Sequence, residues 1–108
     1  MTTYLVKFTY TPETWAKLLA QPEDRRVTLE PLFKAADVKL LGLWYGLGSP
    51  DGYMLAETPD GRTPESTLMA AFASGAFSGV STTVLLTVEE TLAALRQDSG
   101  VSYRPPGG

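Results

Sequence analysis

The groups in this chain that could do chemistry are carboxylates, lysines, arginines, tyrosines and small hydroxyls, because the sequence has no Cys, no His and no Asn. Zinc sites of the usual nitrogen and sulfur type, Cys or Ser-His nucleophiles and His-ligated haem each lose a required ligand or base. A desolvated carboxylate or amine can still titrate near neutral pH. We therefore expect no metal and no cofactor, and any catalysis here would be acid–base chemistry.

The stretch from 48 to 60, GSPDGYMLAETPD, holds several such groups, of which Asp51, Tyr53 and Glu57 are the candidates for a site. Alternation along a strand predicts Asp51, Tyr53 and Glu57 on one face and Met54 on the other. The two carboxylates would lie about 20 Å apart at roughly 3.3 Å per residue, so they cannot form one acid–base pair, whereas Tyr53 could work with either. Each carboxylate also has a structural alternative, with Asp51 as a turn former and Glu57 as a cap or ion-pair partner near the strand end.

Lys7 is a charge in an otherwise apolar strand. If its face lines a closed barrel, burial would favour the neutral amine, and otherwise it extends to the rim or pairs with a carboxylate such as Glu57. Arg25 and Arg26 could anchor an anion or begin a solvated helix with local ion pairs. The catalytic candidates are therefore Glu57, Lys7, Tyr53 and Asp51.

Large aromatic residues mostly belong to the core in a domain of this size. Trp44 and Tyr45 are consecutive, so they point to opposite faces of their strand, and either could line a pocket for a planar organic ligand. The candidates for ligand binding are Trp44, Tyr45, Met54 and Arg26.

Four strands are expected to position these residues. Alternation predicts the first over Thr3–Thr11, and the apolar run Val38–Gly48 is typical of a strand covered on both faces. The third strand follows the turn GSPDG, in which Gly48 and Gly52 accept unusual backbone angles, and the fourth covers Val80–Val88.

Capping signals predict the helices between and after these strands. Thr11 and Pro12 begin a short helix, and Thr87 with Glu90 forms the capping box of a terminal one. A helix after PEDRR carries a buried stripe, and Pro31 either kinks it or marks its first turn. That stripe consists of Leu29, Leu32, Phe33 and Ala36, and a further helix opens at Thr63 and Pro64 with Leu68, Met69 and Phe72 on one face.

The order strand, helix, strand, strand, helix, strand predicts a ferredoxin-like α+β domain over residues 1–97, with an antiparallel four-stranded sheet and an extra C-terminal helix. Residues 98–108 form a Pro/Gly-rich tail. A net charge of −3 with scattered basic residues excludes a nucleic-acid stripe, and no apolar run approaches the roughly 18 residues of a membrane span, so we expect a cytoplasmic protein. A sheet with helices on one face leaves the other to cover, which predicts a homodimer or higher homo-oligomer.

The chain resembles the GYD-domain proteins from about Thr3 to Glu90, in the segments TYLVKFTYT, PEDRR, GSPDGYMLAETPD and GVSTTVLLTVEE. When the segment 48–60 is aligned to the family's pattern without a gap, five residues match the pattern, and Pro50 stands where the family has its signature Tyr. The five are Gly48, Asp51, Glu57, Pro59 and Asp60. The resemblance implies a dimeric α/β-barrel with a ligand pocket between sheet and helices or within the barrel.

Two functions follow from these expectations. The first is a cofactor-independent enzyme of the isomerase, cyclase or oxygenase type, which acts on an aromatic or polyketide-like metabolite by proton transfer. The second is a non-catalytic module for ligand binding or protein assembly. The family resemblance does not choose between them, because it implies no single reaction, and the cost of Lys7 in an apolar strand favours the enzyme.

Overall fold

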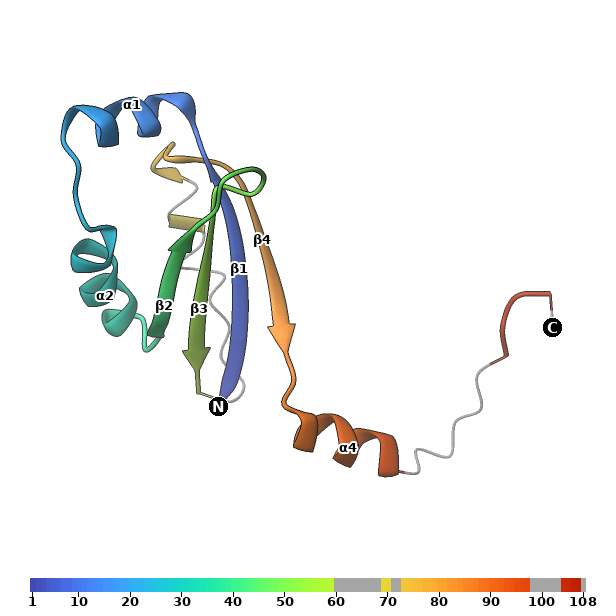
Figure 1. The fold of residues 1–108 in the computed structure, drawn as a ribbon. Helices are drawn as coiled ribbons and strands as arrows, with labels where there is room; N and C mark the ends of the chain where they lie inside the picture. The colour runs from blue at the N-terminus through green and yellow to red at the C-terminus, as the bar shows by residue number, and fades with distance from the viewer. Residues whose placement is uncertain (60–68, 71–72, 98–103, 108) are drawn as a thin grey trace.

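In a computed structural model that describes residues 1–59, 69–70, 73–97 and 104–107, the chain forms a four-stranded antiparallel sheet with the helices at 12–20 and 25–35 on one face (Figure 1). The strands are β1 (Thr2–Tyr10), β2 (Lys39–Tyr45), β3 (Gly52–Thr58) and β4 (Phe77–Leu85), and the helices are α1 (Pro12–Ala20), α2 (Arg25–Ala35) and α4 (Val88–Arg96). The strand order β2-β3-β1-β4 confirms the predicted ferredoxin-like α+β fold.

Local capping starts each of these helices. Thr11 Oγ1 accepts a hydrogen bond from Thr14 N at 3.2 Å before α1, and Asp24 Oδ1 accepts one from Arg26 N at 3.0 Å before α2. The capping box of Thr87 and Glu90 opens α4, as predicted. Figure 1 shows that α4 then extends away from the sheet.

The core lies between the sheet and α2. The alternation of β1 is confirmed, because its even-numbered side chains from Tyr4 to Tyr10 face the helices and are buried. Phe33 of α2 and Val38 close over them. The buried core side chains are Tyr4, Val6, Phe8, Tyr10, Phe33, Val38, Met54 and Ala56.

One expectation for α2 was wrong, and one pair of alternatives is decided. Leu32 is 51% exposed and so does not belong to the buried stripe. Consecutive side chains point in different directions around a helix, so when Phe33 faces the sheet its neighbour Leu32 faces solvent. For Pro31 the sequence allowed a position inside the helix or in its first turn. The structure places it inside α2, which begins at Arg25.

The hairpin between β2 and β3 also differs in detail from the prediction. Gly48 has a φ of 135°, as a turn glycine can. Gly52 serves a different purpose, because a Cβ there would lie 2.2 Å from the ring of Phe8, its partner across the β1–β3 ladder. Glycine at this position lets an aromatic ring lie flat against the sheet.

The bounds and burial of two strands need correction. β2 is the edge of the sheet and not a strand covered on both faces, since Trp44 and Tyr45 are 54% and 48% exposed. It ends at Tyr45 because Gly46 N donates to Asp51 O at 2.8 Å and closes the hairpin. β4 begins earlier than predicted, at Phe77, and ends at Leu85, because Thr87 is already the cap of α4.

The helix predicted from Thr63 lies mostly outside the described residues, within which Met69 and Ala70 are helical. Among the described parts of the chain, no helix combines the length and the apolar character needed to cross a membrane.

Candidate functional site

The sheet register places three of the candidate residues in one row on the open face, which is the face turned away from α2. Lys7 lies directly opposite Tyr53, and Tyr53 lies opposite Trp44 on its other side. Cβ atoms of such cross-strand partners are about 4.5–5.5 Å apart. Lys7 and Tyr53 are therefore neighbours on this face, and the Tyr53 ring extends toward Gly46 at the β2–β3 hairpin.

Glu57 stands in a different row, opposite Thr3 and Lys39. It is about 13 Å from Tyr53 along β3, at roughly 3.3 Å per residue. The register thus gives Glu57 a lysine partner other than Lys7. Glu57 and Lys39 line a cavity of about 450 Å³ at the C-terminal end of α2.

The carboxylate of Asp51 is not on the open face with Tyr53 and Glu57, contrary to the prediction from alternation. Asp51 precedes the first residue of β3, so the period of the strand does not extend to it. Its Oδ2 accepts a hydrogen bond from Tyr10 N at 2.9 Å and another from Trp15 Nε1 at 3.0 Å. Asp51 does bond a backbone N–H, as a turn former would, but that N–H belongs to a residue distant in the sequence.

Tyr45, in contrast to Trp44, points to the helix side, where it joins an aromatic cluster. Tyr10 is its centre, with ring centroids 5.2 Å from Trp15, 5.3 Å from Phe77 and 6.2 Å from Tyr45. Most of these rings meet edge to face or tilted, the arrangements that aromatic quadrupoles favour. The aromatic cluster consists of Phe8, Tyr10, Trp15, Tyr45 and Phe77.

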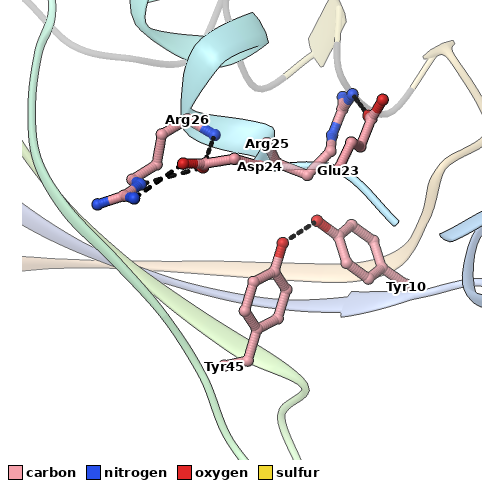
Figure 2. A network of polar contacts seen from close by, with 6 residues as sticks. All are labelled: Tyr10, Glu23, Asp24, Arg25, Arg26 and Tyr45. Carbon is pink, nitrogen blue, oxygen red and sulfur yellow. Dashed lines mark hydrogen bonds and ion pairs between the residues drawn. The ribbon is translucent and has the colours of Figure 1, made fainter. Parts of the chain in front are cut away.

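A pair of phenolic hydroxyls lies inside this cluster. The hydroxyl oxygens of Tyr10 and Tyr45 are 3.3 Å apart, and either can donate to the other (Figure 2). Burial raises the pKa of Tyr10 well above its ordinary value of about 10, the hydrogen bond to Tyr45 raises it further, and Arg25 opposes the shift. Tyr10 is therefore a neutral hydrogen-bonding group at physiological pH. The hydroxyl that accepts this hydrogen bond still has its own hydrogen, which it can donate to an oxygen of another molecule such as a ligand.

Two arginines stand beside the pair, each with an acidic neighbour. Arg26 donates to Asp24 through Nε at 3.0 Å and through Nη2 at 2.8 Å, and both side chains lie on the exposed surface. This contact is a local ion pair, which the sequence allowed as the alternative to an anion anchor. Arg25 pairs with Glu23. Figure 2 shows the Arg25–Glu23 pair on the side of Tyr10 and the guanidinium of Arg26 extending the other way.

Two cavities adjoin the aromatic cluster beneath α1 and the segment 21–24. One of about 220 Å³ is lined by Tyr10, Phe77, Lys17 and Arg25 among others. The second, of about 260 Å³, is lined by Trp15, Leu18, Pro22, Glu23 and Tyr45. The two cavities with the aromatic cluster between them are called the aromatic pocket below. Met54 is 4% exposed and lies in the core, outside the linings of these cavities.

Sequence reasoning had named Trp44 or Tyr45 as the residue that lines a pocket, and Arg25 as a candidate anion anchor. It missed Tyr10, Trp15 and Phe77 as residues of this pocket. Tyr10 is the last residue of β1 and Trp15 lies in the first turn of α1, so the chain reversal at Thr11 brings them together. The alternation that assigns Tyr10 to the core side was one available signal. In the described residues, no group of three or more Asp and Glu side chains could hold a metal ion.

Comparison with known proteins adds a family. The family model described as the GYD domain matches residues 4–95. The chain belongs to the GYD-domain family. No curated protein matches this GYD domain. A solved structure that it resembles is the C-terminal domain of the MgtC protein from Mycobacterium tuberculosis, with 17% identity over 79% of this chain and 88% of that one and a TM-score of 0.47.

Proposed function

We propose that this GYD domain binds a planar aromatic or polyketide-like metabolite in the aromatic pocket and promotes proton transfer on it without a cofactor. The observation that carries the proposal is the hydroxyl pair of Tyr10 and Tyr45 set among stacked and edge-on rings beside two cavities. Pockets for small molecules are mostly apolar, with a few placed polar groups that orient the ligand.

The hydroxyl pair supports a specific role in this chemistry. A carbonyl or enol oxygen of the ligand would accept the hydrogen that the pair leaves over, and the linked hydroxyl behind it would strengthen that bond. Because Tyr10 stays neutral, it acts as a donor that polarises the oxygen and not as a base. Glu23 lines both cavities and pairs with Arg25, so its carboxylate would take the proton from the ligand carbon. Arg25 at the rim would then face the enolate that this proton loss leaves.

We also propose that the open face is the contact surface of a homodimer. Trp44 is half exposed there, in the row of Lys7 and Tyr53, and Leu5 pairs with Leu55 in the adjacent row. Packing of two such faces around a two-fold axis buries the apolar side chains and encloses the Lys7–Tyr53 pair. The pair would then lie between the two sheets and apart from the ligand in the aromatic pocket.

A second candidate function is binding without catalysis. It is favoured by the state of two groups, since Tyr10 in the pocket is held neutral and the carboxylate of Asp51, which bonds Tyr10 and Trp15, already accepts two hydrogen bonds. Neither group is then available as a strong base. In this alternative the pocket holds its ligand and leaves it unchanged.

Isothermal titration with lawsone, a hydroxynaphthoquinone, tests the binding, with naphthalene as the ligand that has the same rings and no oxygen. We expect lawsone to bind and Tyr45→Phe to weaken it about 2- to 10-fold, since a hydrogen bond contributes about 0.5–1.5 kcal/mol. Tyr53→Phe likewise removes a phenolic oxygen, but from the open face, and should leave the affinity for lawsone unchanged. Equal affinity for lawsone and naphthalene, or equal losses in both variants, would contradict the proposal.

Deuterium exchange separates the two functions. In deuterated buffer, the C–H between the enol and carbonyl carbons of lawsone is exchanged for C–D, and NMR follows the loss of its proton signal. A rate above that of buffer that falls in the Tyr10→Phe and Tyr45→Phe double variant supports the enzyme. Binding with exchange at the buffer rate supports the non-catalytic module.

A further inference from the structure

Asp51 connects the end of β1, helix α1 and the β2–β3 hairpin, through its side chain and its backbone carbonyl. Its Oδ2 receives the backbone N–H of Tyr10, at the end of β1, and the indole N–H of Trp15, in the first turn of α1. Its carbonyl oxygen receives Gly46 N at 2.8 Å and closes the β2–β3 hairpin. The two donors to Oδ2 lie 41 and 36 positions away in the sequence, whereas the hairpin bond is local.

Both residues held by Oδ2 form walls of the aromatic pocket. Tyr10 carries one of the paired hydroxyls, and the ring of Trp15 packs edge-on against it and tilted against Tyr45, with centroids 5.2 and 6.1 Å away. An indole has one N–H donor, so the acceptor that takes it also fixes the rotation of the ring. The direction of the Trp15 ring therefore depends on Asp51.

A carboxylate suits this task better than an amide or a hydroxyl. One carboxylate oxygen has lone pairs for two N–H donors at once, and its charge shortens and strengthens both bonds. The side chain is partly buried at this point, where such bonds are weakened less by water.

We propose that Asp51 is a positioning residue, which sets the places of Tyr10 and Trp15 and thereby the shape and ligand specificity of the aromatic pocket. This inference rests on the proposed function for its ligand and on the two hydrogen bonds for its geometry. It differs from a turn-forming role, because a turn former stabilises the hairpin without fixing the indole on α1.

The geometric part is tested without ligand, by the indole N–H signals in ¹H–¹⁵N NMR spectra. Trp44→Phe serves as the background, so that Trp15 gives the one remaining indole signal. We expect Asp51→Ala to move that signal upfield, as loss of a charged acceptor does, and Asp51→Asn to move it less. Asp24→Ala, which removes a capping aspartate that bonds Arg26 and not Trp15, should leave the signal in place.

The functional part is tested with lawsone on the same proteins. Asp51→Ala should weaken binding 10-fold or more, Asp51→Asn should restore part of the loss, and Asp24→Ala should bind as the parent does. An unmoved indole signal in Asp51→Ala, or a loss of affinity no greater than in Asp24→Ala, overturns the inference.

Each failure can be told apart. If the parent protein does not bind lawsone, the proposed function fails for this ligand, and the indole signal alone then decides the role of Asp51. If Asp51→Ala does not fold, Asp51→Asn carries both measurements, and Trp15→Phe adds a third. In Trp15→Phe the indole donor is absent, so Asp51→Asn should weaken lawsone binding less in that background than in the parent, and an equal loss overturns the inference.

Discussion

The stability of the protein at high pH should depend on Tyr10. Burial and the hydrogen bond to Tyr45 raise the pKa of this phenol in the folded state well above its ordinary value of about 10. A raised folded-state pKa gives stability that is complete below the unfolded value and is lost as the pH rises toward the folded value. The folded protein holds the proton in this range and the unfolded protein releases it, so unfolding becomes easier as the pH increases.

The size of the effect follows from the linkage relation. Above the unfolded pKa, each pH unit removes about 1.4 kcal/mol from the free energy of unfolding for as long as folded Tyr10 keeps its proton. Between pH 9 and 11 the contribution of Tyr10 should therefore fall by about 1.4 kcal/mol, because the loss begins only near pH 10. Other phenols and lysines also titrate there, so the quantity to compare is the difference between variants.

Urea denaturation of the parent protein, Tyr10→Phe and Tyr45→Phe at pH 8 to 11 measures this difference. Tyr10→Phe should flatten the pH dependence by the amount above. Tyr45→Phe should flatten it by less, because burial, which remains, is the largest cause of the shift. Equal pH dependence in the parent and in Tyr10→Phe would refute the burial of this hydroxyl and with it the description of the pocket.

Three further predictions concern the frame around the site. Gly52→Ala should destabilise the protein by about 1–3 kcal/mol in thermal unfolding, because its Cβ would meet the ring of Phe8 at 2.2 Å, whereas Gly79→Ala, with open space around it, should stay within about 0.5 kcal/mol. Thr87→Ala should cost α4 about 1 kcal/mol and reduce its helical NMR shifts while those of the sheet stay as they are. Sedimentation should give about twice the chain mass of 11.7 kDa, and Trp44→Glu on the open face should return the monomer, while a monomeric parent contradicts the homodimer.

The parts of the fold that local chemistry determines could be predicted from the sequence. The alternation of β1, the Thr11 cap with Pro12 and the capping box at Thr87 all lie where they were expected. Each depends on residues within a few positions of one another, so its physical cause is visible in a short stretch of chain. The order of these elements then indicated the sheet.

The site could be predicted only in part, because its contacts join residues far apart in the sequence. The alternation of side chains along a strand predicted that Trp44 and Tyr45 point to opposite faces, but it did not indicate which of the two faces the helices cover. The partners of Asp51 are 36 and 41 positions away, and the alternation used to place it does not extend beyond Gly52. Leu32 was misplaced for a similar reason, since the direction in which α2 faces the sheet is set by tertiary packing.

The central claim is that the ligand lies in the aromatic pocket and not on the open face. The two tryptophans report on these places separately, because Trp15 belongs to the pocket and Trp44 to the open face. Titration of the ¹⁵N-labelled parent protein with lawsone, followed through its two indole N–H signals, is the most direct test. Our account predicts that the Trp15 signal moves with the ligand concentration while the Trp44 signal stays in place. Movement of the Trp44 signal alone, or of neither, would contradict it.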